Sequence, residues 1–157
     1  DIVFGDWSSD VCSSDLLCTS TRENAEVVEK KHVWGVAKRY NNTIARAKKG
    51  DTLLIYAMQT KIDDNILPSI ISGEYQVISD VYEDDSRIFQ TPPFLGDESF
   101  PLRLKLKPLN IFKPPIEFKP LIPELGFIKN KKMWTGHIRG AMRVIPEEDY
   151  RKIISGR

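Results

Sequence analysis

The sequence has few of the residues that build disulfides, metal centres or membrane spans. Among its 157 residues there are only two cysteines and two histidines. Two cysteines are too few for a disulfide framework, and no stretch approaches the ~18 consecutive apolar residues of a membrane span. We therefore expect no membrane partner, and the low cysteine content without a secretory signal favours a cytoplasmic location.

The spacings that mark cofactor and catalytic sites are absent as well. Cys18, His32 and His137 form no HxH, HExxH or CxxC pattern, so we expect no metal site. The chain has no glycine-rich phosphate-binding loop and no GxSxG turn. Cys18 lies in an apolar stretch and is expected to be a buried, inert thiol, although a Cys–His nucleophile stays an open alternative. These absences favour a protein that has no cofactor and is not an enzyme.

The first sixteen residues differ in composition from the rest of the chain. They contain four Asp and no Lys or Arg, and residues 6–16 match one translated reading frame of a common sequencing-adapter oligonucleotide. We therefore expect residues 1–16 to be an artefactual or disordered leader, and residues 17–157 to form a single domain. The whole chain has a formal charge of +1, but this domain has 23 basic and 18 acidic residues, which gives +5. The higher charge suits a polyanionic partner.

Hydrophobic patterning in the first half of the domain predicts two strands and a helix between them. Residues 16–20 are expected to form a first strand, and residues 22–31 a helix that is capped by Ser20 or Thr21. Residues 32–36 are expected to form an exposed apolar turn, followed by a short helix over 43–48. The apolar run 52–58 predicts a central strand that is buried on both faces.

The second half predicts further strands and a terminal helix. One strand is expected within 70–82, with Gly73 at a bulge or a point of close approach, and another over 100–106, where Leu alternates with Arg and Lys. Five prolines between 108 and 123 are expected to break the following stretch into short extended pieces. Pro146 is expected to begin a C-terminal helix. This order predicts an α+β fold with a curved mixed β-sheet or partial barrel and flanking helices.

Two groups of residues have the chemistry of nucleic-acid contacts. Residues 129–143 contain five fixed positive charges, no acid, Trp134 and His137, and cations beside an aromatic ring suit phosphates and a stacked base. A solvated basic loop with Trp134 in the core is the equally weighted alternative. Trp34, followed by Gly35, is expected either to wall a pocket or to join the helix to the sheet. The face formed by Arg103, Lys105 and Lys107 is expected to be solvated.

The chain resembles the EVE domain family across residues 17–154, most closely its small single-domain archaeal and bacterial members. Several motifs together carry the resemblance. They are Arg22-Glu23-Asn24, His32-Val33-Trp34-Gly35-Val36, Asn41-Asn42-Thr43-Ile44, Lys49-Gly50-Asp51 with Leu53-Leu54-Ile55-Tyr56, Ser86-Arg87-Ile88-Phe89, Phe118-Lys119-Pro120-Leu121-Ile122, Phe127-Ile128-Lys129-Asn130-Lys131-Lys132, Trp134, and Ala141-Met142-Arg143 with Ile145-Pro146-Glu147-Glu148-Asp149-Tyr150.

The resemblance implies a PUA-like fold related to YTH domains, in which a pocket reads a modified base that is flipped out of the strand. By position it places Trp34, Gly35, Tyr56, Trp134 and His137 in the base pocket. Residues assigned to the nucleic-acid backbone are Arg87, Lys129, Lys131, Lys132, Arg139 and Arg143.

The leading hypothesis is therefore a non-enzymatic module that binds a modified base in single-stranded or locally opened DNA or RNA. The base modification, the choice between DNA and RNA, and the oligomeric state are open at this point. One alternative is a small ASCH-like amidohydrolase acting on modified nucleosides, with Thr60, Lys61 and Glu74 as candidates. Another is a protein-interaction module without a nucleic-acid partner.

Overall fold

A seven-stranded mixed sheet forms the centre of the protein in a computed structural model that describes residues 14–91, 96, 98–138 and 140–155. The strand order is β2-β8-β6-β3-β1-β9, and β7 also pairs with β8. The strands of this sheet are β1 (Asp15–Ser20), β2 (Val33–Val36), β3 (Thr52–Ala57), β6 (Ile70–Val77), β7 (Tyr82–Glu83), β8 (Leu102–Glu117) and β9 (Met142–Ile145). The remaining elements are the helices α2 (Arg22–Lys31), α3 (Asn41–Ile44) and α4 (Glu147–Ser155), the 3₁₀ turns η1 (Lys38–Tyr40), η3 (Lys119–Glu124) and η4 (Trp134–Ile138), and the hairpin of β4 (Thr60–Ile62) and β5 (Asn65–Leu67).

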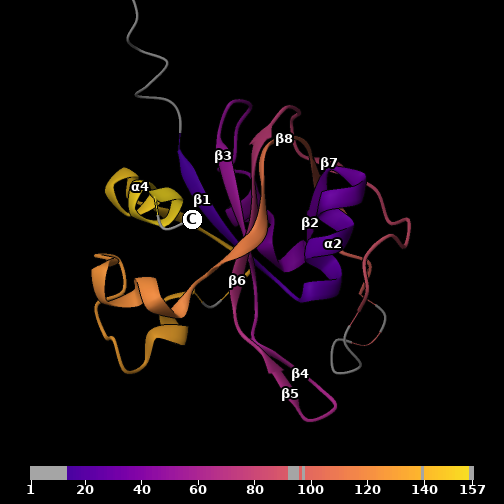
Figure 1. Ribbon diagram of the computed structural model, residues 1–157. Helices are drawn as coiled ribbons and strands as arrows, with labels where there is room; N and C mark the ends of the chain where they lie inside the picture. Colours follow the sequence, from indigo (N-terminus) through magenta and orange to yellow (C-terminus); the bar gives the residue numbers. More distant parts are fainter. Residues whose placement is uncertain (1–13, 92–95, 97, 139, 156–157) are drawn as a thin grey trace, which may run out of the picture.

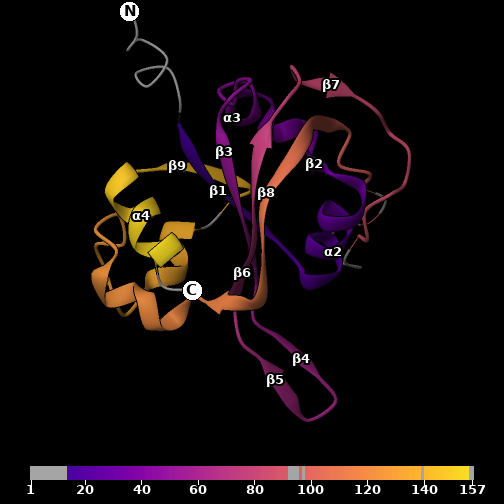
Figure 2. The ribbon, with the colours of Figure 1, turned by 45° about the horizontal axis from the view of Figure 1, so that its top comes forward.

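Strands β1 and β3 are buried on both faces, as the apolar run 52–58 predicted. They pair in parallel, and every other pairing in the sheet is antiparallel. Leu53 and Ile55 belong to the core that α2 covers, whereas Leu54 belongs to the core beneath α4 and the turns η3 and η4. Figures 1 and 2 show α2 on one side of the sheet and α4 on the other. The sheet therefore separates two hydrophobic cores.

Helix α2 has the bounds that the sequence predicted, but the segment that follows it does not form the predicted turn. Thr21 caps the helix by accepting a hydrogen bond from the backbone N–H of Asn24 (3.2 Å). His32 ends the helix in the left-handed conformation, with φ 57°. The expected exposed apolar turn over 32–36 is wrong, because residues 33–36 form β2 and pair with β8. This pairing buries Trp34, which is only 3% exposed.

The prediction that prolines break the chain after residue 106 is also wrong. Strand β8 continues from Leu102 to Glu117 through Pro108, Pro114 and Pro115. Pro108 lies beside one irregularity of the β6–β8 register, and Pro114 and Pro115 lie within the other, which are places where a sheet tolerates proline. Gly73 faces the larger of these irregularities, and the expected bulge at Gly73 is confirmed.

The length of β8 makes the sheet curl into a half-barrel. Its first residues pair with β2 over Leu102–Lys105, and its later residues pair with β6 over 106–117. Because the partner changes along one strand, β2 turns away from the plane of β6 and closes over α2 (Figure 2). The predicted α+β fold with a curved mixed sheet and flanking helices is confirmed.

Several smaller boundaries differ from the prediction. The short helix expected over 43–48 is a 3₁₀ turn followed by α3, which ends at Ile44. The strand expected within 70–82 ends at Val77, and the separate strand β7 begins at Tyr82. The C-terminal helix begins after Pro146 as predicted. Within the described parts of the chain, no helix has the length and apolar character needed to cross a membrane.

The first strand begins inside the stretch that was predicted to be a leader. Asp15 and Leu16 pair with Thr52 and Leu53 of β3, and Leu16 is buried. Asp15 suits this place poorly. Burial, with the carboxylates of Glu147, Glu74 and Asp51 nearby, raises the pKa of Asp15 to about 6, and Arg151 offsets only part of this effect. The rest of the predicted leader, residues 1–13, lies outside the described residues.

We expect Asp15→Asn to stabilise the protein at neutral pH but not in acid. A carboxyl group whose pKa is raised on folding makes the folded state bind more protons, so stability is lost as the pH rises from about 4 to about 6. The gain from Asp15→Asn should be about 1 kcal/mol near pH 7 after allowing for solvent screening, and close to zero near pH 3.5. Urea unfolding at the two pH values measures it, and the exposed Asp85→Asn is the control. An equal gain at both pH values would contradict this account.

Candidate functional site

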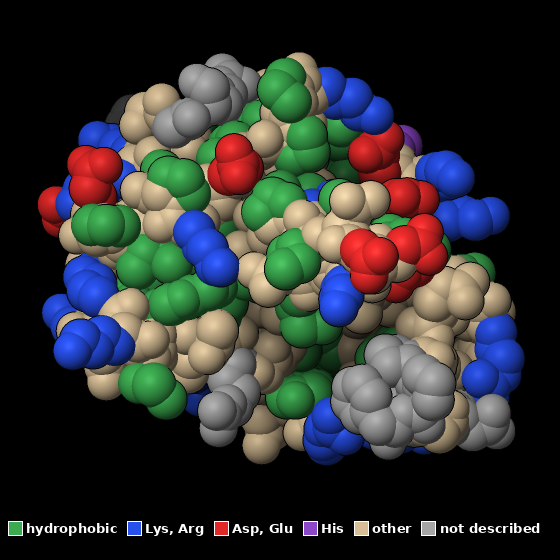
Figure 3. Space-filling model, turned by 60° about the horizontal axis from the view of Figure 1, so that its bottom comes forward, with side chains coloured by type: hydrophobic (Ala, Val, Ile, Leu, Met, Phe, Trp, Pro, Cys, Tyr) green, Lys and Arg blue, Asp and Glu red, His purple; other side chains and the backbone are tan. Residues whose placement is uncertain are grey.

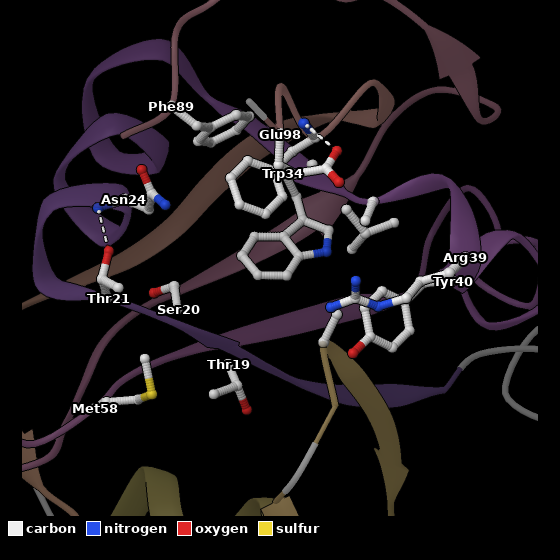
Figure 4. Close-up of a pocket in the computed structure, with 15 residues that line it drawn as sticks. Thr19, Ser20, Thr21, Asn24, Trp34, Arg39, Tyr40, Met58, Phe89 and Glu98 are labelled. Carbon is white, nitrogen blue, oxygen red and sulfur yellow. Dashed lines mark hydrogen bonds between the residues drawn. The ribbon is translucent and has the colours of Figure 1, made fainter. Parts of the chain in front are cut away.

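A cavity of about 130 Å³ lies where β1 ends and α2 begins. Its apolar wall comes from β2, from the β7–β8 loop that carries Phe89 and Phe100, and from residues just after β3 and just before β9 (Figure 4). The polar residues at its rim come from the end of β1, the first turn of α2, the η1 turn and the loop before Phe100. The apolar lining is Trp34, Val36, Ala37, Met58, Phe89, Phe100 and Ala141, with Gly35 between them, and the polar lining is Thr19, Ser20, Thr21, Asn24, Arg39, Tyr40 and Glu98.

Trp34 is the central side chain of this cavity. Strand β2 places it opposite Leu104 of β8, and its indole is 3% exposed. Its Nε1 atom is buried and has no hydrogen-bond acceptor among the described residues. In Figure 4 this nitrogen lies on the side of the ring that faces Arg39 and Tyr40. The indole therefore offers both an aromatic surface and an unused donor.

Two phenylalanines form the wall opposite the end of β1. The rings of Phe89 and Phe100 pack edge to face, with centroids 5.9 Å apart. Asn24 of α2 holds the end of the β7–β8 loop that carries Phe89, because its amide donates to the Gln90 carbonyl (2.9 Å) and accepts from the Gln90 N–H (2.7 Å). The aromatic wall is thereby tied to the helix that begins at the cavity.

Gly35 lets both ends of the β7–β8 loop approach β2 closely. A Cβ atom at this position would lie 2.7 Å from a ring carbon of Phe89 and 2.9 Å from the carbonyl oxygen of Phe100. Neither contact is compatible with a real Cβ atom unless the wall moves. Gly35 is therefore required for the shape of the cavity.

The rim carries one anionic and one cationic group. Glu98 accepts a hydrogen bond from the backbone N–H of Phe100 (3.0 Å), which fixes its carboxylate beside the cavity. The guanidinium carbon of Arg39 lies 5.0 Å from the centre of the Tyr40 ring. A hydrogen-bond acceptor and a cation are thus available at the edge of an apolar space.

The structure brings only two of the five predicted pocket residues into this cavity, Trp34 and Gly35. Tyr56 lies on the opposite face of the sheet, because alternation along β3 turns it into the other core, where it packs on Phe118. Trp134 also packs against Phe118, with ring centroids 5.8 Å apart. His137 accepts a hydrogen bond from the Asn130 N–H through Nε2 (3.1 Å). The placement of Tyr56, Trp134 and His137 in the cavity is therefore corrected.

The predicted backbone-contacting residues lie in different surroundings. Lys129 and Lys132 are exposed, and the Lys131 ammonium donates to the Leu125 carbonyl (2.7 Å). Arg143 donates to the His137 carbonyl (2.7 Å) and lies over the Phe127 ring. Arg87 lies exposed in the loop before β8, and Arg139 lies outside the described residues. Figure 3 shows one face of the molecule, with Lys and Arg side chains largely around apolar side chains.

Arg103 is not on a solvated face, contrary to the prediction from the alternation of β8. It is 1% exposed, whereas its neighbours Lys105 and Lys107 are exposed as expected. The reason is that β2 and β7 flank Arg103 on either side, and the two ends of the β7–β8 loop fold over its side chain. Alternation along a strand does not reveal which loops cover a face.

Sequence reasoning missed most of the cavity wall. Phe89 belongs to a motif that supported the family resemblance, but the site role was assigned to its neighbour Arg87. Asn24 also belongs to such a motif, which was its only signal. Phe100 and Glu98 follow a loop rich in Pro, Gly and acidic residues, where periodicity carries no information about contacts.

The position of Cys18 fits the inert thiol that the sequence predicted, because Cys18 is fully buried in β1 and burial raises the pKa of its thiol. Among the described residues, no three His, Cys, Asp or Glu side chains come together as metal ligands would.

The sequence and the fold define the class of this protein. The EVE domain family model matches residues 16–156, and the chain belongs to that family. A UPF0310 protein of Pyrococcus horikoshii is 50% identical over 139 residues, which cover 87% of this chain and 94% of the relative.

Two solved structures share the fold at low sequence identity. The human THYN1 protein, in complex with DNA that contains 5-methylcytosine, matches with a TM-score of 0.57 and 15% identity over 90% of this chain and 96% of that one. The YTH domain of Zygosaccharomyces rouxii MRB1, in complex with N6-methyladenosine RNA, matches with a TM-score of 0.60 and 14% identity over 91% of this chain and 85% of that one. The fold is thus PUA-like, as the resemblance implied.

We expect Gly35→Ala to destabilise the protein and to reshape the cavity. The new methyl group overlaps Phe89 and the Phe100 carbonyl, and overpacking of this kind costs about 1–3 kcal/mol. Gly136→Ala is the matched control, because a Cβ atom there meets nothing within 4 Å and should change stability by less than about 0.5 kcal/mol. Chemical denaturation measures both variants, and equal costs would refute the close approach at Gly35.

Proposed function

We propose that this protein is a non-enzymatic nucleic-acid binding module that takes a modified base, flipped out of DNA or RNA, into the Trp34 cavity. The observation that carries the proposal is the state of Trp34. Its indole is almost fully buried, forms part of an otherwise largely apolar wall, and keeps a donor that has no partner among the residues that the structure describes. This combination suits a planar ring that can stack and that presents a hydrogen-bond acceptor.

The energetics of the indole N–H favour a ligand. A buried polar group without a partner costs about 1–3 kcal/mol, so native proteins rarely leave one unused. An acceptor on a bound base would remove this cost only when the base is inside the cavity. The Trp34 N–H would therefore add affinity for the flipped base and not for the strand around it.

The size of the cavity supports a small planar ligand. Its volume of about 130 Å³ lies well below the ~300–1,000 Å³ of sites for larger small molecules. Trp34, Phe89 and Phe100 line it, and aromatic walls bind a base that has left its stack. Glu98 and Arg39 at the rim would contact polar edges of the base or the adjoining sugar and phosphate.

The structural comparisons support the same function. THYN1 and the MRB1 YTH domain share this fold and were solved with 5-methylcytosine DNA and N6-methyladenosine RNA respectively. At 14–15% identity the likeness establishes the fold alone. The chemistry of the Trp34 cavity is what supports base binding by this chain. We propose DNA or RNA as the partner on this basis.

The amidohydrolase alternative receives no support from the arrangement of its candidate residues. Thr60 and Lys61 lie on the β4–β5 hairpin, which forms a sheet of its own. Glu74 lies on β6, where its carboxylate accepts hydrogen bonds from Asn110 and from the Tyr150 hydroxyl of α4. The three side chains therefore do not form one catalytic group, and we propose a binding module rather than an enzyme.

We expect Trp34→Phe to reduce selective binding by about tenfold while leaving weak general binding intact. The substitution keeps an aromatic wall but removes the indole N–H, whose hydrogen bond to a ligand is worth about 1 kcal/mol or slightly more. Affinities are measured for single-stranded DNA with one 5-methylcytosine and for RNA with one N6-methyladenosine, each against the unmodified strand at fixed salt.

Trp134→Phe provides the matched control for this experiment. It makes the same chemical change at a tryptophan that packs on Phe118, away from the cavity. The control should retain the preference for the modified strand. If Trp34→Phe and wild type show the same preference, the cavity is not the site of base recognition.

We expect exposed lysines of the loop after Ile128 to govern the salt dependence of binding. Each cation that neutralises a phosphate of a single strand contributes about 0.7 to the slope of log affinity against log salt concentration. Lys129→Gln and Lys132→Gln should each lower the slope by up to about that amount without changing base preference. The exposed Lys107→Gln on β8 is the control, and a slope unchanged in both loop variants would exclude this loop from the interface.

A further inference from the structure

The aromatic wall of the cavity depends on a buried arginine that does not itself line the cavity. We propose that Arg103 is a positioning residue, which holds Phe89 and Phe100 in the geometry that makes the Trp34 cavity selective. The proposal rests on the proposed function of that cavity. It follows from contacts of Arg103 with both ends of the β7–β8 loop, which carry the two rings.

The guanidinium group of Arg103 makes hydrogen bonds to both ends of the β7–β8 loop. On one side Nε donates to the Phe100 carbonyl (3.1 Å), and Nη2 donates to the Ser99 carbonyl (3.0 Å). On the other side Nη1 donates to Ser86 Oγ (2.9 Å), and Nη2 donates to the Ser86 carbonyl. Three of these four acceptors are backbone carbonyls, so Arg103 fixes the course of the chain.

Arg103 also contacts one of the rings. Its guanidinium carbon lies 5.4 Å from the centre of the Phe89 ring, within the range of a cation–π interaction. Within the described part of the chain, the carboxylate that pairs with its charge is that of the half-exposed Asp84, at 3.5 Å. The cation is therefore held mainly by carbonyl dipoles and by the ring that it orients.

The geometry of the group explains why it is an arginine. A guanidinium presents five N–H donors in a rigid planar fork, whereas an ammonium presents three donors at one point. Donors that reach Ser86, Ser99 and Phe100 at once need the fork. A lysine at this position would keep the charge and the packing of the aliphatic part of the side chain. It would release at least one end of the β7–β8 loop.

The β7–β8 loop needs such a clamp, because few residues otherwise hold its first end to the sheet. Strand β7, from which the loop departs, pairs with β8 at Arg103 and Leu102. The other end of the loop enters β8 directly at Leu102. Recognition sites depend on side chains held to within about 0.5 Å, and neighbouring residues must supply that rigidity. Arg103 supplies it from the strand that lies between β2 and β7.

A purely structural role predicts a different result from a positioning role. If Arg103 only stabilised the fold, Arg103→Lys would lower the melting temperature and would leave the folded protein as selective as before. If it positions the wall, the folded variant itself would have a looser cavity. The experiment must therefore be made on folded protein and must report on the cavity.

The test combines Arg103→Lys with the milder Ser86→Ala, which removes a single acceptor at the surface end of the clamp. Lys105→Gln is the control, since it alters an exposed cation two residues along the same strand. Trp34 is observed alone in a Trp7→Phe, Trp134→Phe background, and acrylamide quenching of its fluorescence is measured without ligand. Selectivity is then measured with the 5-methylcytosine DNA and N6-methyladenosine RNA strands and their unmodified counterparts.

We expect Arg103→Lys to increase quenching of Trp34 and to lower the ratio of modified to unmodified affinity about tenfold, with the salt slope unchanged. Ser86→Ala should change both readouts in the same direction by less, and Lys105→Gln should change neither. If Arg103→Lys does not fold, Ser86→Ala decides. Wild-type quenching and selectivity in folded Arg103→Lys, or in Ser86→Ala in its place, would overturn the proposal.

The two levels of the argument fail in different ways. If wild-type protein does not distinguish modified from unmodified strands, the proposed function is wrong. In that case the quenching of Trp34 in ligand-free protein still decides whether Arg103 holds the wall. If wild type is selective and the variants keep both closed walls and selectivity, only the role of Arg103 is wrong.

Discussion

The parallel pairing of β1 with β3 is the constraint on which the rest of the structure depends. Both strands are buried on both faces, so the chain must supply apolar cover on each side. Helix α2 follows β1 immediately and covers one face, whereas the turns after β8 and the helix α4 cover the other. Because α2 begins where β1 ends, the end of this central strand becomes one side of a cavity.

The cavity is formed where the half-barrel remains open beside α2. Strand β2 closes over the helix by pairing with the first residues of β8, and this pairing turns Trp34 inward. The rest of the aromatic wall comes from the β7–β8 loop, which supplies Phe89 and Phe100. A strand therefore positions Trp34, and the rest of the aromatic wall lies in a loop that Asn24 and Arg103 hold in place.

The sequence was sufficient for the elements that local patterning determines and for residues in recognisable motifs. Helix 22–31 and the buried strand, predicted over 52–58 and found over 52–57, followed from capping and from an apolar run, and a family motif singled out Trp34. Tyr56 was misplaced because its motif did not show which face of β3 it occupies. Arg103 was misplaced because strand alternation describes the strand alone, and its burial comes from the β7–β8 loop, whose two ends fold over its side chain. The way a loop folds over a strand leaves no periodic signal.

Separate parts of the surface would supply affinity and selectivity. In the proposed function, exposed lysines after Ile128 would act on phosphates through long-range, salt-screened attraction, which is the same for every sequence. The Trp34 N–H would act only at short range and only when a base is inside the cavity. A protein whose domain carries a modest excess of positive charge would bind unmodified strands weakly, so the short-range contacts in the cavity would contribute a large part of the total. Rigidity of the cavity wall then matters more than additional surface charge, because selectivity is the difference between two affinities that share the same electrostatic component.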